Sequence, residues 1–453
     1  MLQPVETFID RHDALTPFSH IIIASPINPR VLAVICEYAE RTHTPVFYVH
    51  CVGFYAHFSI YLPPTFPIVD THPDPDSMSD LRLLRPWPTL VQFAAEQTQN
   101  LDDMNNHDHG HVSYVLLLLY YLEVWRASHD GKAPTAYKDK NAFREMVRAS
   151  MRTNNPEQGE ENYEEAVAAV LKSLNEPVPS SAVRDVLNAP ECQQLSSGSA
   201  NFWIIASSIS QFYQKHGVLP VPGSLPDMKA QSADYIKLQN VYKTKAREDV
   251  QEVLSTVRSL ELSLGRAKPI EASEVETFCK NAAYIKLVRG RPFHIVAPNH
   301  KLTWGERAKV ARQALTDETS LILLYIAFLA WDEFGAAYAA DAHVSAPQPP
   351  GLTDVDGDAE KLTSIAHKII ANLVAESGVP FEDEDELDDV KAKAGEICQE
   401  LARAGGAELH NIAALAGGLV AQEVIKVVTK QYIPVDNTCL FDGINSASSV
   451  LRL

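Results

Sequence analysis

The sequence of 453 residues has none of the short motifs that mark a nucleotide or catalytic site. It contains no G-x-G-x-x-G or G-x-x-x-x-G-K-[ST] loop, and no G-x-S-x-G, H-E-x-x-H or kinase signature. The glycine pairs at 405/406 and 417/418 lack the strand, loop and helix context of a phosphate cradle. We therefore expect no catalytic residue and no cofactor-binding residue in this chain.

Cysteine is scarce, and its spacing excludes the common metal and redox motifs. No C-x-x-C pair or Cys/His cluster joins the six cysteines, which are Cys36, Cys51, Cys192, Cys279, Cys398 and Cys439. Cys36 and Cys279 have apolar neighbours at helical spacing, which predicts buried thiols. Cys192 lies in the loop-like APECQQLSS, but no His, Asp or Asn partner can be assigned to it. We expect reduced thiols and no nucleophilic cysteine.

The chain has fewer basic than acidic residues. The chain has 39 Lys and Arg against 58 Asp and Glu, a formal charge of −19 at pH 7, and we find no basic stripe that would override it. Such a charge repels phosphate backbones, so we expect no nucleic-acid partner. The acidic run FEDEDELDD (381–389) is interpreted as a solvated loop or helix start.

No long apolar run is present. YVLLLLYYL (114–122) and LILLYIAFLAW (321–331) are shorter than the roughly 20 residues that a membrane span needs, so we expect buried helices. The N-terminus MLQPVETFIDRHD carries acids early and lacks the apolar segment of a secretory signal. We expect no membrane association, and a location in the cytoplasm and nucleus.

The first 80 residues predict part of an α/β domain. SHIIIAS (19–25) and PVFYVHCV (45–52) are β-branched runs, and the segment between them (28–42) has helical spacing with Asn28 as its expected N-cap. This order predicts two parallel strands joined by a right-handed crossover. Gly53 allows a turn or bulge before FYAHFSIYL (54–62), an edge-like or antiparallel strand.

The middle of the chain, from 81 to 404, predicts helices almost throughout. They are expected at 112–127, 141–152, 160–174, 201–216, 232–262, 272–288, 305–314, 318–340, 358–377 and 387–404. A long apolar helix (409–430) and two short strands, YIPVDNTCLFDG and SSVLRL, then return to α/β character. The simplest topology is one α/β domain formed by 1–80 and 405–453 and split by a helical insertion at 81–404.

Gly417 and Gly418 interrupt the apolar helical segment NIAALAGGLVAQEVIKVV. Each glycine costs roughly 0.5–1 kcal/mol against alanine inside a helix. A pair is therefore expected where missing side chains allow close approach of another backbone. We expect this helix to cross the sheet there.

The stretch NNHDHGH (105–111) is a candidate metal site. It holds His107, Asp108, His109 and His111 within seven residues. Short His-rich tracts are only compositional signals, and no distant cluster supplies the remaining ligands. Asp108 or Ser113 is instead expected to cap the helix that begins near Tyr114. We therefore expect no metal.

Four stretches resemble a known family. LHNIAALAGGLVAQEVIKVVTKQ (409–431) closely resembles a helix near the end of the adenylation domain of ubiquitin-type (ThiF-like) activating enzymes. The resemblance is narrowed by LPDMKAQSADYIKLQNVYKTKAREDV (225–250), DHGH (108–111), and PVPSSAVRDVLNAPEC (177–192) followed by FWIIASSISQFYQKHG (202–217). Together they are similar to the regulatory, non-catalytic subunit of the heterodimeric enzyme that activates the Nedd-type (Rub) ubiquitin-like modifier, the amyloid-precursor-binding protein one family. The resemblance runs from about residue 15 to the C-terminus.

The resemblance implies a Rossmann-like adenylation half interrupted by a mainly α-helical domain. In the family, ATP with Mg, the adenylated modifier and the thioester cysteine belong to the catalytic subunit. It also implies a heterodimer with that subunit, in which the two α/β halves pack pseudo-symmetrically, and a role in cullin modification. His109 and His111 fall on a family motif with no known metal.

Family members begin with about 80 to 90 more residues. We therefore interpret the α/β domain as N-terminally truncated and expect SHIIIAS to lie at a sheet edge. Two alternatives are kept open at this point. One is a stand-alone adenylating or nucleotide-dependent enzyme with a degenerate loop. The other is the corresponding subunit for the Sumo-type modifier, whose helical insertion should be much shorter than 81–404.

Overall fold

The computed structural model describes residues 9, 14–74, 80–153, 159–292, 302–342 and 348–453. Most of the N-terminal stretch MLQPVETFIDRHD, on which the expected lack of a secretory signal depends, lies outside these residues. The chain divides into two compact units. Unit 1 comprises residues 1–68 and 288–453, and unit 2 comprises residues 69–287.

A five-stranded sheet with the order β1-β2-β3-β6-β7 forms the centre of unit 1. Its strands are β1 (Ile21–Ala24), β2 (Val46–Val52), β3 (Tyr55–Tyr61), β6 (Thr438–Asp442) and β7 (Ala447–Leu451). β1 and β2 are parallel and the remaining pairs are antiparallel. The predicted strand–helix–strand unit is thus confirmed, with α2 (Pro29–Thr42) between its two strands. β1 lies at the edge of the sheet, as expected for SHIIIAS.

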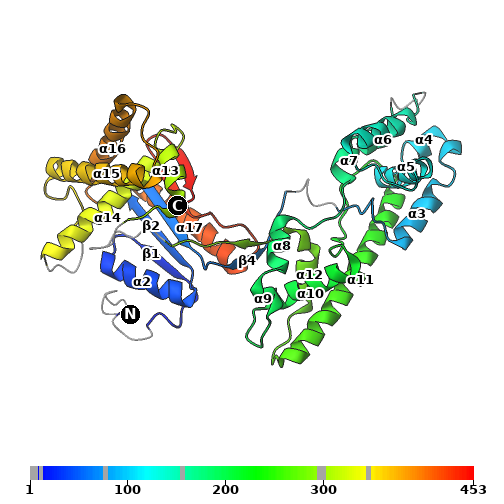
Figure 1. Ribbon diagram of the computed structural model, residues 1–453, viewed down its shortest axis with the longest axis horizontal. Coiled ribbons are helices and arrows are strands. Elements are labelled where there is room, and N and C mark those ends of the chain that lie inside the picture. The colour runs from blue at the N-terminus through cyan, green and yellow to red at the C-terminus, as the bar shows by residue number, and fades with distance from the viewer. Residues whose placement is uncertain (1–8, 10–13, 75–79, 154–158, 293–301, 343–347) are drawn as a thin grey trace. The chain divides into compact units, whose positions relative to one another are not determined.

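Helices cover both faces of this sheet (Figure 1). Alternate side chains of a strand point to opposite faces, and β2 follows this rule. Phe47 and Val49 pack toward α17 (His410–Thr429), whereas Tyr48 packs toward α2 and His50 toward α14 (Ile322–Ala342). Gly53, at the β2–β3 turn, has φ +55°, and a Cβ added there would lie 2.9 Å from the Ala404 Cβ. The expected turn is therefore also a place of close packing.

Four helices of the middle segment belong to unit 1, not to a separate helical insertion. They are α13 (Ala308–Ala314), α14, α15 (Val355–Ser377) and α16 (Glu384–Ala404). The bounds expected from the sequence, 1–80, 81–404 and 405–453, therefore differ from the observed units. Helical periodicity shows that a helix buries one face, but it does not show which other segment covers that face. Here α14 packs on the sheet, and α15 and α16 pack on α14.

Unit 2 is almost entirely helical and has two hydrophobic cores. Its longer helices are α3 (Pro88–Thr98), α5 (Tyr114–Ser128), α6 (Tyr137–Ala149), α7 (Glu161–Ser173), α8 (Ser181–Leu187), α10 (Asn201–His216), α11 (Ser232–Leu264) and α12 (Ala272–Lys280). The helix expected at 272–288 ends at Lys280. Residues Ile285–Val288 instead form β5, which pairs with β4 (Phe66–Val69). The apolar alternation of IKLV fits either structure, and the pairing with a strand far away in the sequence decides between them.

Candidate functional site

One face of α17 packs on the sheet of unit 1. Its buried residues are Ile412, Ala416, Val420, Glu423 and Val427, at the spacing of one helical face. The apolar ones among them contact apolar side chains of β2 and β3. The prediction that this helix crosses the sheet is confirmed.

The role predicted for the glycine pair is wrong. A Cβ added to Gly417 or Gly418 would meet nothing within 4 Å, and both residues are exposed. The sheet is covered by the opposite face of the helix, so no backbone of the described chain approaches the glycines. The periodicity correctly predicted one buried face of α17 but did not show which face.

The exposed side of α17 carries an apolar strip, flanked by the exposed polar residues Asn411, Gln422 and Thr429. We define it as the outer face of α17, formed by Ala414, Gly418, Ala421, Ile425 and Val428. A surface helix normally carries polar or charged residues on the side away from its core. Ile425 is 51% exposed and Val428 is 56% exposed. Small residues at three of the five positions would allow the backbone of another helix to approach closely.

Within the described residues, α17 is the one helix long and apolar enough to cross a membrane, with 28% of its apolar window buried. Its packing on β2 and β3 argues against that interpretation, because open sheets do not enter the hydrocarbon region of a bilayer. The apolar composition is better explained by two packing faces. One covers the sheet of this chain, and the other is exposed.

Glu423 fixes α17 to the segment that leads into β6. Its Oε1 lies 2.6 Å from Lys426 Nζ, and its Oε2 accepts a hydrogen bond of 2.8 Å from the Val435 backbone N–H. The carboxylate is buried, so these two partners offset its loss of hydration. Within the Q-E-V-I-K part of the resemblance, the Glu and the Lys are therefore explained by the attachment of the helix.

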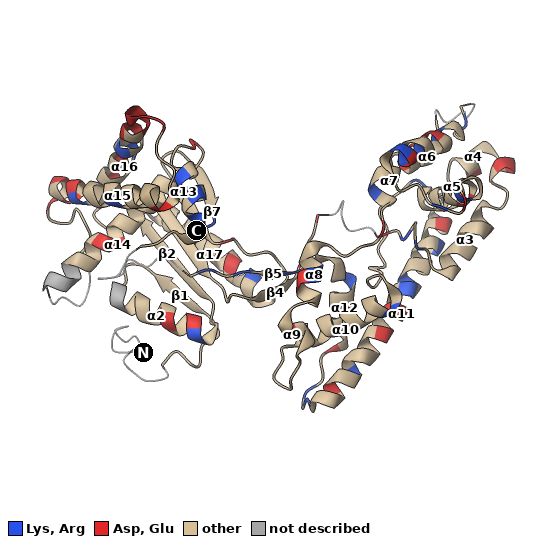
Figure 2. Ribbon diagram, in the orientation of Figure 1, with Lys and Arg blue, Asp and Glu red and all other residues tan. Residues whose placement is uncertain are grey.

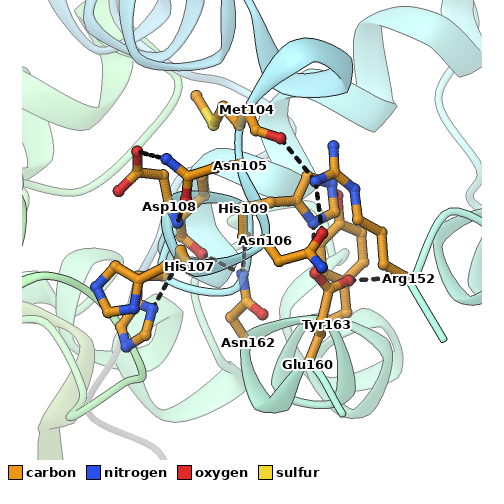
Figure 3. A network of polar contacts seen from close by, with 12 residues as sticks. Met104, Asn105, Asn106, His107, Asp108, His109, Arg152, Glu160, Asn162 and Tyr163 are labelled. Atoms are coloured by element: carbon orange, nitrogen blue, oxygen red, sulfur yellow. Dashed lines mark hydrogen bonds and ion pairs between the residues drawn. The ribbon is translucent and has the colours of Figure 1, made fainter. Parts of the chain in front are cut away.

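The candidate metal tract lies in unit 2, where its histidines separate (Figure 3). His109, in α4 (Asn106–His109), is buried with Nδ1 2.6 Å from Glu160 Oε1 and Nε2 3.0 Å from the Tyr163 hydroxyl. His111 is only half-buried, and its Nδ1 lies 2.6 Å from the backbone oxygen of His107. One histidine thus belongs to an internal network, and the rings of the other two lie 4.3 Å apart at a tilted angle near the surface.

This network connects the tract to α7 and to the end of α6. Glu160 Oε2 accepts a hydrogen bond of 2.7 Å from the Arg152 backbone N–H. Arg152 in turn donates to the backbone oxygen of Met104, and Asn162 donates to the backbone oxygen of His109 (Figure 3). A histidine paired with a buried glutamate resembles an acid–base pair, but both groups are fully used in joining three segments. We interpret the network as structural. Sequence reasoning missed Glu160 because 51 residues separate it from His109.

Neither expected capping residue caps α5. Ser113 occupies the N-cap position, but its side chain makes no cap hydrogen bond. Asp108 lies in α4, where its carboxylate accepts hydrogen bonds from Asn105 and Gln231. The prediction of a side-chain cap before Tyr114 is wrong, because the carboxylate is used in tertiary contacts.

A second buried group of titratable side chains lies between the sheet of unit 1 and α14. The His50 and His57 rings are 5.9 Å apart, and Phe328 packs 4.5 Å from His57. Burial lowers the pKa of His57 to about 3. Burial also lowers the pKa of His50 well below its usual range, and the nearby His57 lowers it further. Burial also raises the pKa of Asp332, whose Oδ1 lies 3.9 Å from His50 Nδ1, to about 7. Both His57 nitrogens lack a hydrogen-bond partner among the described residues.

The cysteines are free thiols, and most are buried. Burial, with a minor contribution from nearby carboxylates, raises the pKa of Cys36 and of Cys279 to about 12. Cys192 lies on the short helix α9 (Pro190–Gln193) instead of the expected loop, and burial raises its pKa to about 11. A thioester-forming cysteine needs a stable thiolate, so these environments oppose that chemistry.

The acidic run at 381–389 forms the start of α16, where Figure 2 shows Asp and Glu together. Asp383 is the N-cap, and its side chain accepts a hydrogen bond of 2.8 Å from the Glu386 backbone N–H. Negative charge is favourable at a helix N-terminus. The interpretation of this run as a solvated helix start is confirmed.

The whole chain is similar to curated proteins, although it matches no family model. It is 30% identical to the NEDD8-activating enzyme E1 regulatory subunit of Xenopus laevis over 455 residues, covering 99% of this chain and 80% of the relative. It is 32% identical to the protein of that name from Danio rerio, covering 85% of this chain and 68% of the relative. The NEDD8-activating enzyme E1 regulatory subunit AXL of Arabidopsis thaliana is also 32% identical, with the same two coverages.

Proposed function

The chain belongs to the family of NEDD8-activating enzyme E1 regulatory subunits, and we propose that the outer face of α17 docks on the catalytic subunit of that enzyme. The observation that carries this proposal is the apolar composition of a fully formed, exposed helix face. Ile425 and Val428 are already about half buried, so covering the rest of each against a partner would contribute roughly 1–1.5 kcal/mol per side chain. Nothing in the comparisons favours the Sumo-type alternative.

The proposed role of the chain is to support a partner that performs the chemistry. ATP and Mg would bind the catalytic subunit, where the carboxylate of the modifier is adenylated and passed to a cysteine. The high pKa values of the buried thiols Cys36, Cys192 and Cys279 support the assignment of the thioester step to the other subunit. The regulatory chain would hold the adenylation half of its partner in the active arrangement, in the cytoplasm and nucleus.

The sheet of unit 1 explains how such support could be transmitted. Glu423 joins α17 to the segment before β6, and β6 pairs with β3 in the centre of the sheet. A helix fixed at one face to a sheet presents its other face as a rigid surface. A partner that packs on this surface would bind a face that is already held in place. Little conformational entropy of this chain would therefore be lost on binding.

The test is co-expression with the catalytic subunit. Ile425→Asp places a charge in the centre of the outer face of α17 without altering its buried face, so we expect co-purification and ATP-dependent NEDD8 thioester formation to fall at least about tenfold. Leu262→Asp, at an 83% exposed position of α11 in unit 2, is the matched control and should change neither. If Ile425→Asp co-purifies as well as the parent chain, the proposed docking face is wrong.

A second measurement separates the subunit from a stand-alone enzyme. The chain alone should not catalyse ATP–pyrophosphate exchange, whereas the complex should. Robust exchange by the purified chain would contradict the assignment of adenylation to the partner.

A further inference from the structure

A pocket in unit 2 has the opposite charge to the rest of the molecule. It lies between α11, α12 and the loop before α11, and its volume is about 600 Å³. Lys243 and Arg247 of α11 and Lys280 of α12 line it, and Glu276 is the one acidic side chain among its lining residues. The whole chain has a formal charge of −19, whereas this pocket is lined by three cationic side chains and one carboxylate.

The wall of this pocket is held rigidly by the loop that contains Gly223. Gly223 has φ +78°, and a Cβ added there would lie 2.7 Å from the Ala246 Cβ, so the loop touches α11 directly. The backbone N–H of Val221 donates to Asp249 Oδ2 over 3.0 Å, and Asp249 is buried and paired with Lys245. The pocket is thus formed in the isolated chain and does not depend on a partner to shape it.

Several polar groups of the pocket have no partner of their own. Within the described residues, Arg247 and Lys280 make no ion pair, and Lys243 donates only to the neutral side chain of Gln239. The buried hydroxyl oxygen of Ser224 has no hydrogen-bond partner there either. Cations without an ion pair match an anionic ligand, because a carboxylate accepts hydrogen bonds from lysine and arginine side chains.

The geometry of α11 indicates the shape of that ligand. The lining residues of α11 extend from Gln239 to Gln251, which at 1.5 Å per residue is about 18 Å. An extended peptide covers this length with about five or six residues. Lys243 and Arg247 are one helical turn apart, about 6 Å along the axis. Alternate side chains of an extended peptide are about 6.6 Å apart on one face, a close match.

The remaining lining groups also suit a peptide. The Gln251 amide can both donate to and accept from a peptide backbone, and the amide nitrogen of Gln239 can donate to it. Val221, Leu225 and Val250 provide apolar wall between the polar groups. We propose that this pocket binds an extended acidic peptide segment of a partner protein, with carboxylates at alternate positions that face Lys243 and Arg247. This proposal does not depend on the outer face of α17.

The experiment uses the full chain and fluorescein-labelled peptides at 150 mM salt, with binding followed by fluorescence anisotropy. The probe Ser-Glu-Ser-Glu-Ser-Glu should bind, whereas Ser-Gln-Ser-Gln-Ser-Gln should not. A peptide of the same composition with its three glutamates contiguous should bind at least about threefold more weakly. Equal binding of the two acidic peptides would overturn the proposed spacing.

Substitutions in the protein locate the site. The double variant Lys243→Gln/Arg247→Gln should weaken binding of the alternating peptide at least about tenfold. The control is Lys237→Gln/Lys268→Gln, which lowers the net charge by the same amount at exposed positions outside the pocket. If the control weakens binding equally, only net charge matters and the pocket is not the site.

A third arm separates the peptide from a small anion. Inorganic phosphate at 10 mM should displace little of the alternating peptide when the ionic strength is held constant. Complete displacement would show a small-anion site and overturn the peptide proposal. Thermal unfolding should be unchanged in both double variants, which confirms that any lost binding is local.

Discussion

The imidazole Nδ1 of His109 lies 2.6 Å from the carboxylate Oε1 of Glu160, and both side chains are buried. Glu160→Gln keeps the shape of the side chain but removes its charge and one of its acceptor oxygens. Because the carboxylate also accepts from the Arg152 backbone N–H, we expect a loss of about 1–3 kcal/mol in the free energy of unfolding. Urea denaturation of the full chain measures this change.

The neighbouring residue provides the control for this variant. Glu161 is 66% exposed and lies 3.3 Å from Lys229, an ordinary surface pair. Glu161→Gln should therefore change the free energy of unfolding by less than about 1 kcal/mol. Equal effects of the two substitutions would contradict the structural role of the His109 network.

The His57 side chain makes stability depend on pH in a defined direction. Its pKa is lowered from the usual 6.5 to about 3, so between these values the unfolded chain binds the proton that the folded chain does not. Its contribution to stability is full above pH 6.5 and is lost as pH falls toward 3. His57→Phe removes this titration and suits the aromatic surroundings. When the pH falls from 7 to 5, we expect the free energy of unfolding of the variant to decrease by about 2 kcal/mol less than that of the parent chain.

Asp332 acts in the opposite direction, which the measurement must take into account. Its pKa is raised to about 7 by burial, so the stability that it contributes below pH 4 is lost as pH rises toward 7. The side chain is still 22% exposed, and water therefore screens part of this effect. Chemical denaturation at several pH values, with exposed His410→Gln as the control, isolates the contribution of His57. An unchanged pH slope in His57→Phe would contradict the expected role of burial.

The thiols should react slowly in the folded protein. Burial holds the pKa of Cys279 and Cys398 at about 12, and that of the less buried Cys51 at about 11. At pH 8 only a small fraction of each is thiolate, so a disulfide reagent such as Ellman's should label the native chain slowly, with Cys51 first. All six should react quickly in guanidinium. Rapid native labelling of Cys192 would show that its surroundings open.

Strong local patterns predicted much of the fold. The β-branched runs at 19–25 and 45–52, with a helix between them, gave the parallel pair β1–β2 because the connection leaves few other arrangements. The apolar spacing of 409–430 predicted α17 and its contact with the sheet. The bounds of α10 were predicted without error, since Gly217 at φ +67° ends that helix clearly.

Long-range pairing could not be predicted in this way. IKLV at 285–288 is a strand because β4 lies beside it, and α13 to α16 belong to unit 1 because α14 packs on the sheet. The partner of His109 and the open side of Gly418 depend on the same kind of information. Each is decided by segments far apart along the chain, which local composition does not specify.

The chain passes from unit 1 into unit 2 and later returns. In each unit, the two segments at which the chain leaves and returns lie side by side. In unit 1 the Gly290 backbone N–H donates to the Pro63 oxygen over 3.1 Å, and in unit 2 the Asp70 N–H donates to the Tyr284 oxygen over 3.2 Å. A domain with adjacent ends can be added to a host at one surface loop without breaking the order of the host's strands. Unit 2 therefore has the form of a transplantable module. A short loop between Ile68 and Val288 would join the two parts of unit 1 directly.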